Sequence, residues 1–273
     1  MATMSIRGAR LEVEEHGTVD AGRSPLIWGH GLTSSRADED VEPLIDCRRL
    51  AADDRRVVRY DARGHGESES TADVKAYTWD QLALDQLALA DALGIDRYVA
   101  GGASMGAATA LHAAVAAGDR ITGLVLVIPP TAWETRADQT ELYRQMADVV
   151  EERGVEPLIA GAAMLPPPDP FVGRPDVKER RAASLRANDP ARLARVFRGA
   201  ATTDLPAPEQ LARIDVPTAI LAWSGDPGHP VSTAHRLHEL MPHAALSIAS
   251  TSVELTTWTE RADELLQIVD TRR

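Results

Sequence analysis

The feature of this sequence that most limits its fold is an alternation of short apolar runs with helical stretches. In the first half, apolar runs bounded by turn residues predict strands, and residues 80–93 and 104–117 have the spacing typical of helices. Such an alternation favours an α/β fold, with a mostly parallel sheet flanked by helices. Strands are predicted at residues 5–10, 11–16, 24–28, 57–61, 97–102 and 123–128, the first two forming a hairpin at the sheet edge.

The alternation stops after residue 128 and returns near residue 214. The stretch between them, 129–213, is helical or irregular, and a proline cluster at 166–170 interrupts it. We therefore expect one core, 1–128 and 214–273, with 129–213 inserted between the sixth and seventh strands as a helical lid. A separate domain is the alternative, which the return of the strands disfavours. Within this stretch we predict helices at 136–153, 175–187 and 190–201. After it we predict strands at 218–223 and 244–249 and helices at 232–241 and 258–269.

The sequence Gly-Ala-Ser-Met-Gly at 102–106 matches the pattern G-x-S-x-G. It falls between a predicted strand and a predicted helix, where this pattern forms a sharp turn that exposes the serine hydroxyl. Glycine is needed at both ends because a side chain two residues from the serine would collide with neighbouring chain. The helix dipole favours an anion developing at this turn. Ser104 is therefore a candidate nucleophile; the alternative is that it only caps the helix.

Two loops after predicted strands carry candidate partners for Ser104. In His30-Gly31-Leu32, the glycine permits an unusual backbone conformation, so that the amides of Leu32 and Met105 can point at one oxyanion. An ordinary glycine-rich turn is the alternative there. Asp226 follows the strand at 218–223 and is placed to orient an imidazole.

Structural interpretations compete with functional ones at Asp226 and in a third loop, residues 61–68. For Asp226 the alternative to a catalytic role is a simple Asx-turn. In the loop 61–68, Asp61 and Arg63 are expected to brace the backbone, and His65 is expected to be scaffold.

Taken in order, these motifs resemble the α/β-hydrolase superfamily. HG follows the third predicted strand, D-x-R-G-x-G-x-S the fourth, G-x-S-x-G the fifth and G-D-x-x-x-P the seventh. The resemblance covers nearly the whole chain and is to branches with a serine nucleophile, such as esterases, lactonases and perhydrolases. It implies the α/β-hydrolase fold, with Ser104 as nucleophile, Asp226 as acid, and the amides of Leu32 and Met105 as oxyanion donors.

The family pattern also expects a histidine after the last strand, in the chain order Ser, Asp, His. Residues 247–254 read Ser-Ile-Ala-Ser-Thr-Ser-Val-Glu, and no histidine follows them. Without a base, Ser104 would have little nucleophilicity at neutral pH. His229 lies three residues after Asp226 on the loop expected to face Ser104, and it is the preferred substitute. His30 is the second choice.

Three functions are open at this point. The first is a hydrolase of small esters or related acyl compounds with an atypical triad. The second is a binding protein that kept the fold and lost turnover, and the third is a lyase or cyclase that uses only the oxyanion hole. A histidine nitrogen within hydrogen-bond reach of Ser104 would favour the first function. A site with only hydroxyls around the serine would favour the second.

Composition limits the partners of the chain. A net charge of −12 argues against nucleic acid and anionic membranes. The single cysteine, Cys47, excludes an internal disulfide and is expected on a helix. We see no signal peptide, membrane span, phosphate loop, dinucleotide motif or metal-ligand spacing, so we expect a cytoplasmic protein that acts on a small molecule without cofactor or metal.

Overall fold

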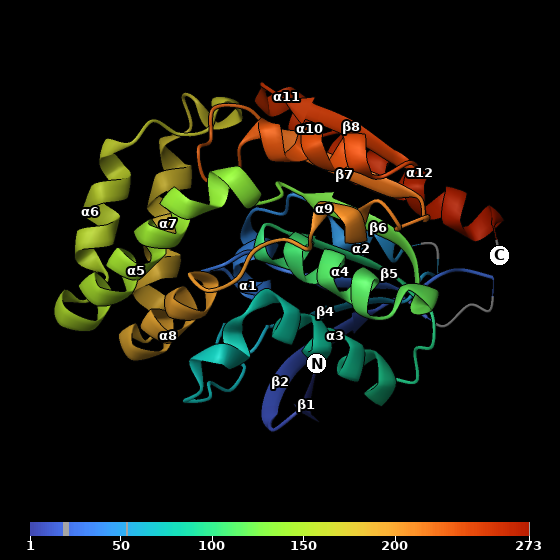
Figure 1. The fold of residues 1–273 in the computed structure, drawn as a ribbon, viewed down its shortest axis with the longest axis horizontal. Coiled ribbons are helices and arrows are strands. Elements are labelled where there is room, and N and C mark those ends of the chain that lie inside the picture. Colours follow the sequence, from blue (N-terminus) through green and yellow to red (C-terminus); the bar gives the residue numbers. More distant parts are fainter. Residues whose placement is uncertain (19–21, 53, 273) are drawn as a thin grey trace.

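The computed structural model describes residues 1–18, 22–52 and 54–272. Its centre is an eight-stranded sheet in the order β1-β2-β4-β3-β5-β6-β7-β8, with helices on both sides (Figure 1). β1 and β2 are antiparallel to their neighbours, and the other six strands are parallel to one another. The strands are β1 (Ala2–Ile6), β2 (Ala9–His16), β3 (Leu26–Gly29), β4 (Val57–Tyr60), β5 (Tyr98–Ala103), β6 (Ile121–Val127), β7 (Thr218–Trp223) and β8 (Ala244–Ala249).

Alternate residues of the central strands face two separate apolar layers. In β6, Leu124 and Leu126 pack into the layer under α3 (Trp79–Ala92) and α4 (Met105–Ala116). Val125 and Val127 pack into the opposite layer, under α2 (Cys47–Leu50) and α12 (Trp258–Thr271). Because both faces are covered, the strands read as continuous apolar runs.

The remaining helices are α1 (Arg36–Val41), α5 (Arg136–Arg153), α6 (Glu156–Met164), α7 (Pro175–Ala187), α8 (Pro190–Ala200), α9 (Pro208–Leu211), α10 (Val231–Leu240) and α11 (Ser252–Leu255). The 3₁₀ turns are η1 (Val74–Tyr77), η2 (Gly118–Arg120), η3 (Trp133–Thr135) and η4 (Asp169–Phe171).

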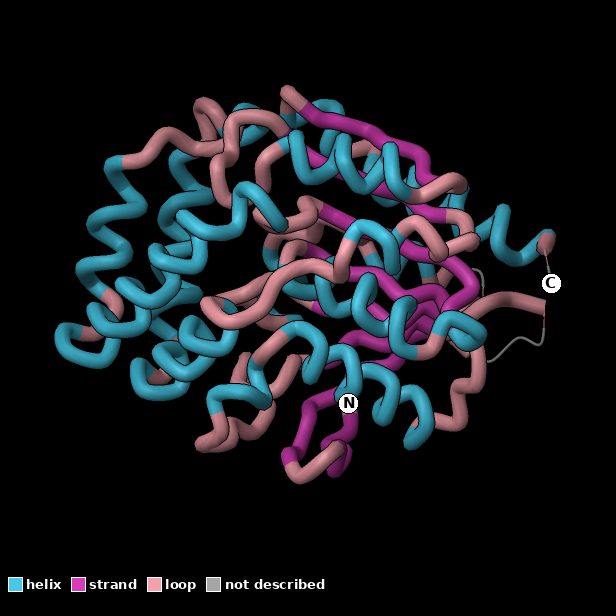
Figure 2. Tube along the Cα trace, viewed as in Figure 1, coloured by secondary structure: helices cyan, strands magenta, loops and turns pink. Residues whose placement is uncertain are grey.

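The chain between β6 and β7, all of which is described, forms helices and loops and no strand. α5, α6, α7 and α8 gather beside the sheet, and Figure 2 shows this group as helix and loop alone. Ala147, Val150, Leu193, Ala194 and Phe197 give it a small apolar core of its own. This helical insertion therefore has an apolar cluster of its own, while its Phe171 and Val177 pack into the layer under α2 and α12.

The helical insertion meets the core at the carboxyl ends of the strands. Its hydrogen bonds reach the loops that follow β3, β4 and β7: Ser184 to Thr33, Arg192 to Gly66, Asp169 to Ser224 and Thr131 to Gly228. Ligands of open α/β sheets bind outside this edge.

The element types predicted from sequence are found, but some limits differ. The strand predicted at 5–10 is wrong: β1 ends at Ile6 and β2 begins at Ala9, and the hairpin turns between them at Arg7 and Gly8, whose φ angles are 44° and 80°. The sequence did not predict α1, α6, α9 or α11. Three of these helices have only four to six residues, too few to show a helical period, and α6 is apolar on all sides.

Glu39 on α1 makes stability depend on pH. Its carboxylate accepts a hydrogen bond from Trp28 Nε1 at 2.9 Å, and the nearest guanidinium nitrogen of Arg59 is 3.9 Å away. Burial raises the pKa of Glu39 to about 7, because the attraction to Arg59 and the bond from Trp28 only partly offset desolvation. The folded protein thus holds this proton more tightly than the unfolded chain. The resulting stability is fully present below pH 4.5 and is lost as the pH rises to about 7.

We expect Glu39→Gln to stabilise the protein more at pH 8 than at pH 5, by about 1–2 kcal/mol. The amide keeps an acceptor for Trp28 and removes the cost of a buried charge. Urea unfolding of both proteins at the two pH values measures the difference. An equal change in the free energy of unfolding at pH 5 and pH 8 would show that the pKa of Glu39 is not raised in the folded protein.

Candidate active site

Ser104 occupies a strained turn between β5 and α4. Its φ and ψ are 52° and −106°, a backbone conformation that residues with a side chain rarely adopt. The amide of Ser104 donates to the carbonyl of Val127 at 2.9 Å, which ties the turn to β6. The side chain makes no capping bond to α4, so the serine is not held there as a helix cap. It remains 8 % exposed.

The two glycines of the motif are required by close backbone packing. A β-carbon on Gly102 would lie 2.5 Å from the carbonyl oxygen of Gly29, and one on Gly106 would overlap the same oxygen. The start of α4 therefore lies directly against the end of β3. This contact holds the serine above the carboxyl edge of the sheet, as the sequence pattern predicts.

The loop after β7 brings an imidazole to the serine. Nε2 of His229 lies 2.8 Å from Oγ of Ser104, and Nδ1 lies 2.9 Å from Oδ2 of Asp226. The ionised carboxylate only accepts hydrogen bonds, so Nδ1 carries the proton and Nε2 is left to accept from the serine hydroxyl. The structure thus places the three predicted residues in one hydrogen-bonded chain.

Asp226 receives further donors. The indole Nε1 of Trp223 donates to Oδ2, and the amide of Gly228 donates to Oδ1, both at 2.9 Å. Burial alone would raise the pKa of this carboxyl, but the bonds from His229, Trp223 and Gly228 outweigh it and hold the pKa well below its usual range. Asp226 is therefore ionised throughout the range in which the protein is expected to work.

The two backbone amides predicted as oxyanion donors belong to residues next to Ser104 in the chain or next to Gly31, which lies beside it. Met105 is the first residue of α4, and Gly31 lies close enough that a β-carbon on it would be 3.8 Å from that of Ser104. In the described part of the chain, neither the amide of Met105 nor that of Leu32 donates to a protein acceptor. The arrangement is suited to an oxyanion hole built from these two amides.

His30, the second candidate base, does not reach the serine. Its Nδ1 bonds the carbonyl of Gly31 at 2.8 Å, and its Nε2 accepts from the amide of Ala62 at 2.9 Å. Burial lowers the pKa of His30, which is consistent with a neutral ring that uses both nitrogens. It therefore links the loop after β3 to the loop after β4.

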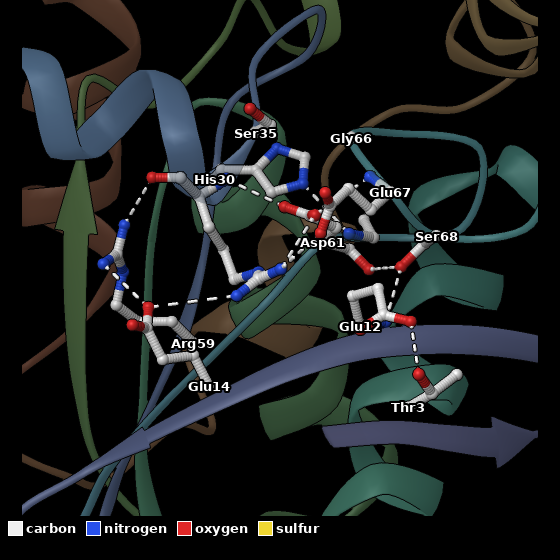
Figure 3. A network of polar contacts seen from close by, with 12 residues as sticks. Thr3, Glu12, Glu14, His30, Ser35, Arg59, Asp61, Gly66, Glu67 and Ser68 are labelled. Carbon is white, nitrogen blue, oxygen red and sulfur yellow. Dashed lines mark hydrogen bonds and ion pairs between the residues drawn. The ribbon is translucent and has the colours of Figure 1, made fainter. Parts of the chain in front are cut away.

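The loop after β4 is braced as the sequence predicts. The carboxylate of Asp61 accepts from the amides of Arg36 and Glu67 at 2.8 and 3.1 Å, in the network that Figure 3 shows around His30. Arg63 forms a buried ion pair with Asp85 on α3. Burial lowers the pKa of His65 to about 3, and its Nδ1 bonds a backbone carbonyl, so it belongs to the scaffold.

The position where the family pattern expects a histidine is occupied by a helix cap. The carboxylate of Glu254 accepts hydrogen bonds from the amides and hydroxyls of Ser250 and Thr251 at 2.8–3.1 Å. These bonds start α11 and occupy the Glu254 carboxylate as the cap of that helix. The remaining histidines are elsewhere: His112 bonds the carbonyl of Asp204, and His243 pairs with Asp215.

Sequence reasoning missed Trp223. It identified the strand that Trp223 ends but gave the indole no part in the site. The only signal was a tryptophan three residues before the candidate acid, and such spacing does not show where an indole nitrogen points.

The described residues contain no group of three or more histidine, cysteine or acidic side chains placed to hold a metal ion. None of their helices is long and apolar enough to cross a bilayer.

The sheet with its flanking helices and the serine turn between β5 and α4 define the class of protein as an α/β hydrolase. A comparison with known proteins gives the same class. Residues 16–265 match the model of the alpha/beta hydrolase family, so the chain belongs to this family.

Individual relatives lie within the same class. The chain is 28 % identical over 197 residues to 3-oxoadipate enol-lactonase 2 of Acinetobacter baylyi, covering 72 % of this chain and 71 % of that protein. It is 31 % identical over 173 residues to 3-oxoadipate enol-lactonase 1 of the same organism, covering 63 % and 62 %, so it spans under two thirds of that relative. A solved hydrolase from Pseudomonas aeruginosa PA01 is 26 % identical with a TM-score of 0.79, over 98 % of this chain and 97 % of that one.

Proposed function

We propose that this protein is a serine hydrolase of small esters or lactones, in which Ser104 is the nucleophile, His229 the base and Asp226 the acid. The observation that carries the proposal is the 2.8 Å separation between His229 Nε2 and Ser104 Oγ. It supports turnover over the binding-protein alternative, for which only hydroxyls would surround the serine. The relatives that hydrolyse enol-lactones by name support a cyclic or open ester as substrate.

The geometry supports the following sequence of steps. Ser104 Oγ attacks the carbonyl carbon of the ester while its proton passes to Nε2 of His229, and Asp226 stabilises the imidazolium. The carbonyl oxygen becomes an oxyanion, which the amides of Leu32 and Met105 bind. The carbon–oxygen ester bond breaks, and the leaving alkoxide takes the proton from His229. Water, deprotonated by the same nitrogen, then attacks the acyl carbon, the bond from this carbon to Oγ breaks, and His229 returns the proton to Oγ as the acid leaves.

The helical insertion, residues 129–213, would serve as a lid in this reaction. Its contacts with the loops after β3, β4 and β7 support a position over the edge where Ser104 lies. Leu32 packs against the insertion's apolar cluster, together with Tyr143 of α5. Side chains from α5 and α8 therefore come close to the proposed oxyanion hole, where they would exclude water.

The test is intact mass after incubation with a small fluorophosphonate. We expect a single adduct on the native chain and none on Ser104→Ala, because only a serine activated by a base reacts readily. Hydrolysis of p-nitrophenyl acetate and of a small lactone, followed at constant pH, should be lost in the same variant. A folded native protein that forms no adduct and turns over neither substrate would contradict the proposed function and favour a binding protein.

A further inference from the structure

Both catalytic partners of Ser104 lie on one short loop. Asp226 and His229 are separated only by Pro227 and Gly228, so the conformation of this loop fixes the acid and the base together. The amide of His229 donates to the carbonyl of Asp226 at 3.2 Å, which closes the loop into a turn. A shift of the loop would move both groups away from the serine at once. The loop therefore needs a rigid attachment.

Trp223 is the residue that supplies such an attachment. It is the last residue of β7 and is 3 % exposed. Its indole stacks on Trp258 of α12, with ring centroids 6.2 Å apart, and meets the ring of Phe171 edge-on at 5.1 Å. It also meets the imidazole of His229 edge-on, at 6.1 Å and 88°. The orientation of the indole is thus set by packing on a buried strand.

The indole nitrogen reaches the oxygen that the base also uses. Nε1 of Trp223 and Nδ1 of His229 both lie 2.9 Å from Oδ2 of Asp226. Rotation of the carboxylate away from the indole would therefore also break its bond to the imidazole. A hydrogen bond from a neutral donor to a carboxylate is among the stronger kinds in proteins, and its loss leaves a buried charge less well solvated.

We propose that Trp223 is a positioning residue that holds Asp226, and through it the tautomer and orientation of His229, for attack by Ser104. This inference rests on the proposed serine-hydrolase function. It assigns to the indole N–H a role that a purely structural tryptophan would not have, because the hydrogen bond and not the ring volume is what matters.

Two buried tryptophans in opposite apolar layers, Trp223 and Trp79, allow a matched comparison. Trp223→Phe keeps an aromatic ring and removes the N–H that bonds Asp226. Trp79→Phe makes the same change at the start of α3, in the opposite apolar layer, where the described chain gives the buried Nε1 of Trp79 no hydrogen-bond partner. We expect Trp223→Phe to lower kcat, and the rate of phosphonylation of Ser104, about 10- to 100-fold with little change in KM. Trp79→Phe should stay within about threefold of native.

A second measurement does not depend on how well the phenylalanine variant folds. In proton NMR of the native protein, the indole N–H of Trp223 should be protected from exchange, and its chemical shift should change in Asp226→Asn, while the chemical shift of the Trp79 indole N–H should stay the same. Equal losses of kcat in the two tryptophan variants, or an indole signal that ignores Asp226→Asn, would overturn the inference. Absence of phosphonylation in the native protein would instead be a failure of the proposed function itself.

Discussion

Replacing His229 by alanine is expected to lower the rate of phosphonylation of Ser104 and of ester hydrolysis by a factor on the order of 10³ or more. The reason is that His229 Nε2, 2.8 Å from Oγ, is the acceptor for the serine proton in this structure. Without it the hydroxyl must ionise unaided, far from its pKa. The comparison uses the initial rate of fluorophosphonate labelling on folded protein, checked by thermal unfolding.

Two controls make this prediction specific. His243→Ala removes a half-exposed histidine that pairs with Asp215 on the surface, and it should leave the labelling rate unchanged. Added imidazole should partly restore labelling to His229→Ala, because the deleted side chain leaves space beside the serine for a free base. Labelling of His229→Ala at the native rate would mean that another group activates Ser104.

Gly106→Ala should destabilise the protein by about 3 kcal/mol or more, which corresponds to a fall in Tm of about 6–12 °C. An alanine β-carbon there would overlap the carbonyl oxygen of Gly29, and both atoms belong to backbone held by α4 and β3. Relief would require α4 to move off the sheet, which would also displace Ser104. Thermal unfolding measures the first effect and fluorophosphonate labelling the second.

The matched control is the same substitution at an open site. A β-carbon on Gly161, within α6, would meet no atom within 4 Å. Gly161→Ala should therefore stabilise the protein slightly, by about 0.5–1 kcal/mol, since alanine favours the helix. A Gly106→Ala variant as stable and as reactive as Gly161→Ala would show that the serine turn does not depend on the close approach of α4 to β3.

The site could be predicted in part. Ser104 and the glycines around it were identified because the turn is a local pattern, in which the steric demand acts on residues two positions away. The hydrogen bond that joins His30 to the loop after β4 was not predicted, because its donor, the amide of Ala62, lies 32 positions along the chain. The contact of Trp223 with Asp226 depends on the direction of an indole at the end of β7, which the packing of Trp258 and Phe171 sets.

The sequence by itself determined the class of fold, the serine turn and the absence of a histidine after the last strand. These follow from periodicity and from motifs that lie within a few residues of one another. Only the tertiary structure decided which histidine meets Ser104, because the two residues are 125 positions apart and β5 and β7 must be arranged in one sheet before their loops meet. In the sheet β7 lies two strands from β5, so the loop after β7 brings Asp226 and His229 to the serine, while the loop after β8 forms the helix cap of α11.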